Sequence, residues 1–162
     1  MRSHAKYDST SLHKKQAWRN LDPIEVEMRF SKIVFWVAGI WGLLVIPPLF
    51  FIFNLIGRQD PPPITHPGFY YGFTTAALAW QIAFLVIAQD PVRFHPLMIP
   101  SVVEKFGYGI VVLILFLQSR MRVGDLLLGS VDLLLGVLFI AAFLKTGTMR
   151  ETISRGDARQ IP

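Results

Sequence analysis

Residues 68–118 read GFYYGFTTAALAWQIAFLVIAQDPVRFHPLMIPSVVEKFGYGIVVLILFLQ and decide the fold of this chain. Two apolar segments, 69–88 and 97–117, flank a short polar turn, DPVRFHP at 90–96. A helix rises about 1.5 Å per residue, so each segment is about 30 Å long, the thickness of a bilayer's hydrocarbon core. In lipid, backbone amides have to be paired within the protein, which a helix achieves on its own. The stretch therefore predicts a hairpin of two transmembrane helices.

Two further apolar blocks lie outside this hairpin, at 33–53 and 126–144, with almost no charge inside them. We therefore expect an all-α fold, an integral membrane four-helix bundle with spans at about 32–54, 69–89, 97–118 and 124–145. More than thirty residues precede the first block, and no small-residue cleavage site follows a short core, so a removable signal peptide is not expected.

The chain divides into three parts by composition. A basic, flexible tail is expected at 1–21, the four-helix membrane domain at 22–145 and a polar, mobile tail at 146–162. Asp22, Pro23 and Glu25 form a typical helix start ahead of the first span. Pro47 and Pro48 are expected to kink or end that span.

The positions of the basic residues predict the orientation. Eleven Lys and Arg residues lie before the first span or after the fourth, against three in the first and third connections. The positive-inside rule then places both termini in the cytoplasm, with the turn at 90–96 on the same side. The proline-rich connection PPPITHP at 61–67 faces outward.

Several classes of function are disfavoured by what the sequence lacks. The chain has no cysteine, which excludes disulfides, thiolate-bound metal clusters and thiol redox chemistry. Its net charge of +5 comes from residues that flank the spans instead of alternating with aromatics, so no nucleic acid partner is expected. Hydrolase, metalloprotease and phosphate-loop motifs are missing, which argues against an enzyme without excluding one.

Polar side chains inside the apolar segments are the main candidates for function, because such groups are costly in lipid. We expect five of them to form one buried polar centre: Gln81, Glu104, Lys105, Tyr108 and Asp132. Three interpretations stay open for this centre. It could fix helix packing only, it could form a ligand or proton site, or it could contact another subunit.

Small residues within the spans predict where helices approach closely. They are Gly39 and Gly42 in the first span and Gly129 and Gly136 in the fourth. In the fourth span they alternate with Asp125 and Asp132 at helical spacing, which makes one narrow stripe.

Four loop residues were singled out as contacts with lipid headgroups or a partner: His66, Asp90, Arg93 and His95. Imidazole is a common axial ligand, so the histidines raise the question of haem or another pigment. They are expected on opposite membrane faces, which excludes a bis-histidine haem within one chain. A single axial ligand is the remaining alternative; no metal site is expected, and the cofactor stays open.

Several segments together resemble a group of small bacterial four-span membrane proteins that are broadly similar to DoxX-like proteins. These segments are AGIWG at 38–42, ITHP at 64–67, FYYGF at 69–73, AWQ at 79–81, DPVR at 90–93, EK at 104–105 and DLLLG at 132–136. The resemblance covers about residues 32–145 and implies a multi-pass protein of the bacterial inner membrane. Some DoxX-like proteins are linked to quinol oxidation, but no residue here matches a motif for that chemistry.

The sequence therefore predicts a non-catalytic inner-membrane protein that serves as an accessory or scaffold subunit of a larger complex, such as a redox or photosynthetic one. Its expected partners are the lipid bilayer and other membrane subunits. The alternative is a protein that binds or transports a small amphipathic molecule, such as a quinone or lipid, in its buried polar centre.

Overall fold

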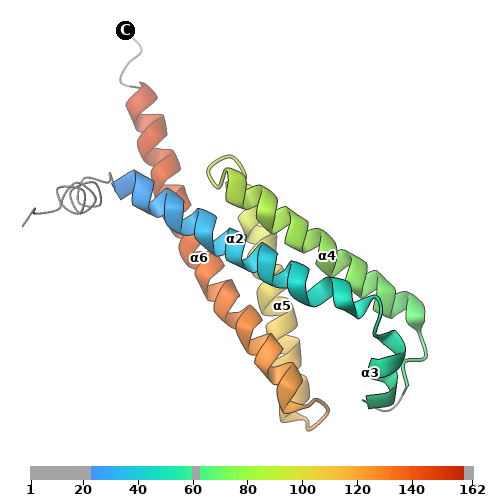
Figure 1. Ribbon diagram of the computed structural model, residues 1–162. Helices are drawn as coiled ribbons and strands as arrows, with labels where there is room; N and C mark the ends of the chain where they lie inside the picture. Colours follow the sequence, from blue (N-terminus) through green and yellow to red (C-terminus); the bar gives the residue numbers. More distant parts are fainter. Residues whose placement is uncertain (1–22, 60–62, 159–162) are drawn as a thin grey trace, which may run out of the picture.

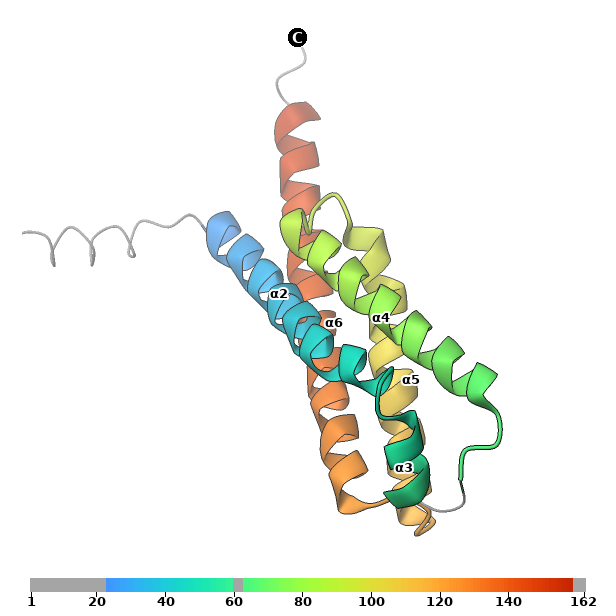
Figure 2. The ribbon, with the colours of Figure 1, turned by 45° about the vertical axis from the view of Figure 1, so that its right-hand side comes forward.

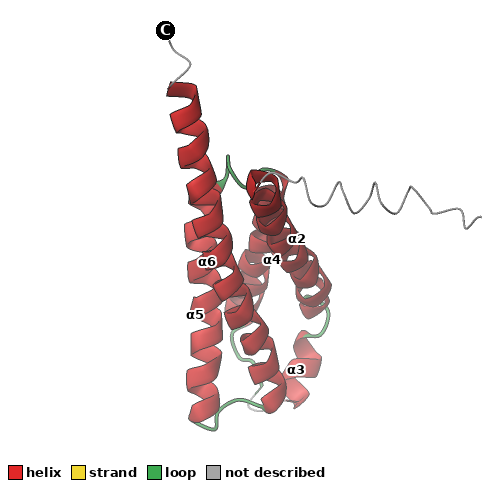
Figure 3. Ribbon diagram, turned by 90° about the vertical axis from the view of Figure 1, so that its left-hand side faces the viewer, coloured by secondary structure: helices red, strands yellow, loops and turns green. Residues whose placement is uncertain are grey.

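The computed structural model describes residues 23–59 and 63–158, and within these ranges every regular element is helical (Figure 3). The elements in chain order are α2 (Pro23–Leu49), α3 (Phe53–Gln59), α4 (Pro67–Gln89), the 3-10 turn η1 (His95–Leu97), α5 (Met98–Leu117) and α6 (Val123–Ala158). Four helices, α2, α4, α5 with η1, and α6, are long and apolar enough to cross a membrane. The predicted all-α fold with four long apolar helices is confirmed, whereas the expected tail at 1–21 and the cap Asp22 lie outside the described residues.

The four long helices form two pairs. Helix α2 packs along α4, and α5 packs along α6, while α2 and α6 join the pairs (Figure 1). Helices α4 and α5 make few contacts although only a short turn connects them. The start of α2, the turn at 90–97 and the end of α6 lie at one end of the bundle, and α3 and the α5–α6 turn lie at the other (Figures 1 and 2).

The hydrophobic core lies toward the end of the bundle that holds the start of α2 and the turn between α4 and α5. It is built around three fully buried phenylalanines. Phe35 of α2 stacks on Phe139 of α6, with ring centroids 4.2 Å apart, and Phe84 of α4 meets Phe139 edge-on at 5.0 Å. Beside them Ser31 Oγ lies 3.0 Å from Thr146 Oγ1, with both residues fully buried. Aromatic packing and a buried hydrogen bond therefore fasten the two helix pairs together at this end.

Glycines allow the close approach within each pair. A Cβ added at Gly39 would lie 2.5 Å from Leu85 Cδ2, and one at Gly129 would lie 2.7 Å from Val112 Cγ1. Of the four glycines predicted to pack, Gly39 and Gly42 thus face α4, whereas Gly129 and Gly136 face α5. Gly109 of α5, which the sequence did not single out, also faces α6, where its Cβ would lie 3.0 Å from the Gly129 carbonyl oxygen.

The first long helix ends earlier than the predicted boundary at 54. Proline has no amide hydrogen, so Pro47 and Pro48 leave two carbonyls of α2 without a helical partner and the helix stops at Leu49. The Tyr70 hydroxyl of α4 donates a hydrogen bond to the Leu49 carbonyl at 2.7 Å. A short turn follows Leu49, and the separate short helix α3 begins at Phe53.

The last helix extends beyond the predicted boundary at 145. Helix α6 continues to Ala158, so the expected mobile tail from 146 is helical over most of its length. Its first turn there is packed against the bundle, since Thr146 is fully buried and Met149 is 2% exposed. The polar composition of this stretch therefore reflects a helix that leaves the apolar part of the bundle, instead of an unstructured tail.

The turn between α5 and α6 has one strained residue. Ser119 has a φ of 57°, the only positive φ among the described non-glycine residues. The Arg120 amide donates to the Leu115 carbonyl at 2.9 Å, and the Ser119 amide donates to the Phe116 carbonyl at 2.8 Å. These two bonds form a Schellman motif, in which the residue at Ser119 is usually glycine.

Candidate functional site

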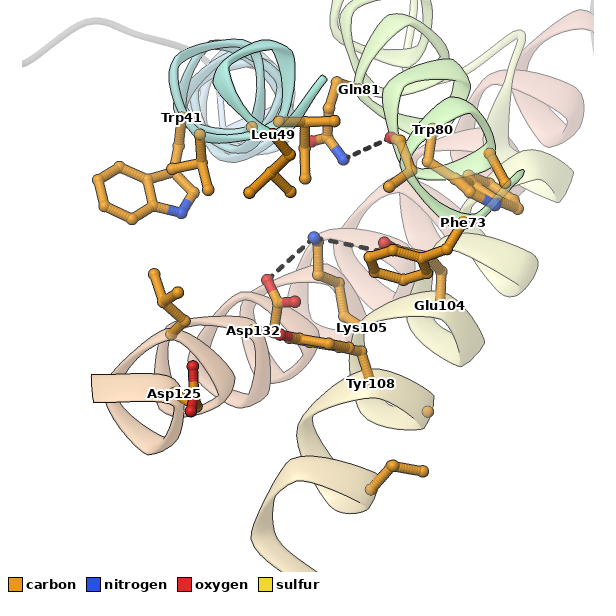
Figure 4. A pocket seen from close by; sticks show the side chains of 18 residues that line it. Trp41, Leu49, Phe73, Trp80, Gln81, Glu104, Lys105, Tyr108, Asp125 and Asp132 are labelled. Carbon is orange, nitrogen blue, oxygen red and sulfur yellow. Dashed lines mark hydrogen bonds and ion pairs between the residues drawn. The ribbon is translucent and has the colours of Figure 1, made fainter. Parts of the chain in front are cut away.

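A cavity of about 540 Å³ lies between the two helix pairs (Figure 4). Residues of α2, α4, α5 and α6 all line it. Among them are the five residues that the sequence assigned to one polar centre: Gln81, Glu104, Lys105, Tyr108 and Asp132. The structure thus brings these five together, and whether they bind a ligand remains a prediction.

Lys105 is the central charged group of this cavity, and it is only 4% exposed. Its Nζ donates a hydrogen bond to Asp132 Oδ1 of α6 at 3.0 Å and lies 3.3 Å from Glu104 Oε2 of its own helix (Figure 4). The same ammonium lies 5.2 Å from the centre of the Phe84 ring. One cation is therefore shared between two carboxylates, each largely shielded from solvent.

Asp132 reaches Lys105 because of the small residues on its own face of α6. Gly129 and Gly136 lie three residues before and four residues after it, where they contact α5 directly. At helical spacing these positions share one side of α6. The close approach of α6 to α5 at the two glycines therefore brings the Asp132 carboxylate within reach of Lys105.

Gln81 of α4 projects toward α2 at the cavity wall and is 2% exposed. Its Nε2 donates to the Ala77 carbonyl at 2.9 Å, which fixes the amide orientation. Its Oε1 is buried and accepts no hydrogen bond from any described residue. Gly42 makes room for this side chain, since a Cβ there would overlap the Gln81 amide.

Glu104 Oε2 is buried against the Lys105 ammonium, 3.3 Å away, which compensates its charge. It and Gln81 Oε1 are the two buried side-chain polar atoms of the described residues that lack a well-aligned hydrogen bond. Both atoms are covered by protein, although their residues line the cavity.

Aromatic side chains form much of the remaining cavity wall (Figure 4). The Tyr108 ring stacks on Phe73 with centroids 6.1 Å apart, and Trp41 and Trp80 also line the cavity. Sequence analysis missed these three aromatics as site residues, because tryptophan and phenylalanine are common anywhere in apolar helices.

Asp125 also lines the cavity, although sequence analysis placed it only in the small-residue stripe. The signal was present, because Asp125 precedes Asp132 by seven residues and therefore lies on the same helix face two turns earlier. Its Oδ2 accepts a hydrogen bond from the Arg122 amide at 3.3 Å in the first turn of α6.

The four predicted loop residues lie outside the cavity lining, at the two ends of the bundle. His66 Nδ1 lies 2.8 Å from Thr65 Oγ1 just before α4. Asp90 Oδ1 accepts a hydrogen bond from the Arg93 amide at 3.1 Å, which stabilises the turn after α4. The Arg93 guanidinium lies 5.4 Å from the Phe94 ring centre.

His95 packs on α6, a contact that the sequence did not predict, and its contact with lipid headgroups or a partner stays a prediction. Its ring stacks on Phe143 at 4.2 Å, and its Nε2 donates to the Phe143 carbonyl at 2.9 Å. Its Nδ1 lies 3.3 Å from Arg150 Nη1 and accepts from it. Both ring nitrogens are engaged, so axial ligation by His95 would require breaking one of these contacts.

Comparisons with protein-family models, with curated proteins and with solved structures give no match to this chain. Over the described residues the fold and the cavity define its class, an all-helical protein with four helices of membrane-spanning length and a cavity between two helix pairs. The function is therefore inferred from the chemistry of the cavity.

Proposed function

We propose that this chain is a multi-pass membrane protein whose central cavity binds a small amphipathic molecule. Large apolar side chains are exposed on all four long helices, among them Ile33, Leu44, Ile82, Leu117 and Leu134. In water such an apolar surface promotes aggregation, whereas in a bilayer it faces lipid. The basic residues near both termini support a cytoplasmic location for both ends, and the bacterial inner membrane stays a prediction.

The cavity is the observation that carries the binding proposal. Its volume of about 540 Å³ is in the usual range for small-molecule sites. Its walls are mainly apolar and aromatic, with a few polar groups that converge from α4, α5 and α6. An apolar chamber with a local polar centre matches a ligand that has an apolar body and a polar head.

The open volume beside the polar centre distinguishes this proposal from a centre that only fixes helix packing. Protein interiors are close-packed, and polar groups that serve packing alone are covered by their partners. Here a cavity of about 540 Å³ adjoins Glu104, Lys105 and Asp132. A ligand head group in that cavity would meet these charged side chains.

The test uses the full-length protein purified in mild detergent, followed by organic extraction and mass spectrometry of bound small molecules. We expect a near-stoichiometric amphipathic compound. A bulky side chain in the cavity should displace it, so Gly107→Phe is compared with Gly72→Phe. Both glycines lie within long helices and have open space at the Cβ position, but only Gly107 lines the cavity.

Loss of the compound in Gly107→Phe but not in Gly72→Phe would support a cavity site. An empty wild-type protein, or equal retention in both variants, would contradict it. The predicted role as an accessory subunit stays a prediction, and protein chains that co-purify in the same experiment would test it.

A further inference from the structure

We propose that the ligand of this cavity carries a protonated primary or secondary amine as its head group, bound by the Glu104 carboxylate. This inference rests on the proposed binding function and names the chemical class of its ligand. Three features of the cavity support it: the charges of its lining residues, the acceptor character of its carboxylates and its aromatic walls.

The charges of the lining residues are unbalanced. Three carboxylates, Glu104, Asp125 and Asp132, line the cavity with a single ammonium, Lys105. The Lys105 ammonium donates to Asp132 at 3.0 Å and lies 3.3 Å from Glu104 Oε2, so one positive charge is shared between two carboxylates. A carboxylate that is buried and incompletely compensated is costly, and a bound cation offsets that cost. An anionic head group would add to the imbalance.

The lining carboxylates favour a hydrogen-bond donor. Glu104, Asp125 and Asp132 accept hydrogen bonds and cannot donate them while they are ionised. A quinone or ketone presents only carbonyl oxygens, which cannot donate to a carboxylate. An ammonium presents two or three N–H donors, and its hydrogen bond to a carboxylate is charge-assisted.

The aromatic walls favour the same head group. Trp41, Phe73, Trp80 and Tyr108 line the cavity beside the polar centre (Figure 4). The faces of aromatic rings attract cations through their quadrupoles, and tryptophan does so most strongly. Aliphatic residues such as Val45 and Val111 line the remaining space and suit an apolar tail.

The experiment measures binding to full-length protein in lipid nanodiscs, with empty nanodiscs as the correction for partition into lipid. Four probes share a ten-carbon tail: decylamine, decyltrimethylammonium, decanol and decanoate. We expect saturable binding of about one decylamine per chain, at least about tenfold tighter than any of the other three probes. Decyltrimethylammonium tests the N–H donors, because it keeps the positive charge without them.

Two variants provide a matched comparison. Glu104→Gln removes the cavity carboxylate, whereas Glu25→Gln makes the same change at an exposed position in the first turn of α2. We expect Glu104→Gln to weaken decylamine binding at least about tenfold and to leave decanol binding unchanged, while Glu25→Gln alters neither. If Glu104→Gln does not fold, the wild-type probe series decides alone.

The outcomes separate the two proposals. If decanol or decanoate binds saturably and as tightly as decylamine, the cavity binds amphipathic molecules but the amine inference is wrong. If decyltrimethylammonium equals decylamine, charge alone selects the ligand and the hydrogen-bond argument is overturned. If no probe binds saturably above empty nanodiscs, both the amine inference and a cavity open to amphipathic chains are contradicted.

Discussion

Replacing Lys105 by methionine removes the only ammonium that lines the cavity while keeping nearly the same side-chain length. Lys105 Nζ lies 3.0 Å from Asp132 Oδ1 and 3.3 Å from Glu104 Oε2. At an effective dielectric constant of about 20, each pair contributes about 5 kcal/mol of Coulomb attraction, much of which offsets desolvation. Because the change leaves two carboxylates close together without a counter-charge, we expect Lys105→Met to lower the free energy of unfolding by about 3–5 kcal/mol.

The assay is reversible unfolding in mixed micelles with increasing SDS fraction, followed by circular dichroism. Lys145→Met is the matched control, because Lys145 forms no ion pair with a described residue and its ammonium lies 5.1 Å from the Phe30 ring centre. We expect that control to cost about 1 kcal/mol or less. The double variant Lys105→Met with Asp132→Asn should cost about 1–3 kcal/mol less than the sum of its two single variants.

Two results would refute this reasoning. If Lys105→Met unfolds within about 1 kcal/mol of the wild type, the buried ion pairs do not stabilise the bundle. If the costs of Lys105→Met and Asp132→Asn simply add, the two side chains do not interact energetically.

Three further predictions concern the packing and the ends of the helices. Gly129→Ala should destabilise the bundle by about 1–3 kcal/mol in the same assay, because the new methyl group overlaps α5, whereas Gly124→Ala, which has open space, should cost nothing. Equal effects of the two changes would contradict close packing at Gly129. Tyr70→Phe should cost about 1 kcal/mol, because the Leu49 carbonyl loses its donor; an unchanged unfolding midpoint would show that water replaces the hydroxyl. Ser119→Gly should raise the free energy of unfolding by up to about 1 kcal/mol, since glycine adopts a positive φ without strain, and a loss of stability would argue against the left-handed turn.

The number of long helices could be predicted from the sequence because it depends on a single physical length. Each apolar block is long enough to cross a bilayer and coincides largely with one of the four long helices of the described residues, although the ends of α2 and α6 differ from the predicted boundaries. The shared location of Gln81, Glu104, Lys105 and Asp132 also followed from the sequence, since their positions along antiparallel helices place them at similar depth.

The pairing of the helices could not be predicted in the same way. It depends on local shape complementarity, such as the Gln81 side chain against the bare Cα of Gly42, which no periodic pattern shows. The same limit explains His95, whose partners Phe143 and Arg150 are about fifty residues away in the chain. The end of α6 was misplaced because polar composition was interpreted as a tail, whereas Thr146 is buried by a contact with α2.

The weak contact between α4 and α5 determines which deformation of the molecule costs least. Within each pair the two helices are closely packed through their glycines, so each pair is expected to move as a rigid unit. The two pairs are joined at one end by the phenylalanine core and the Ser31–Thr146 hydrogen bond. A change in the angle between the pairs therefore disturbs fewer contacts than a change within either pair. If the cavity binds an amphipathic molecule as proposed, a rotation of one pair against the other would adapt it to tails of different width, and selectivity would depend on the head group.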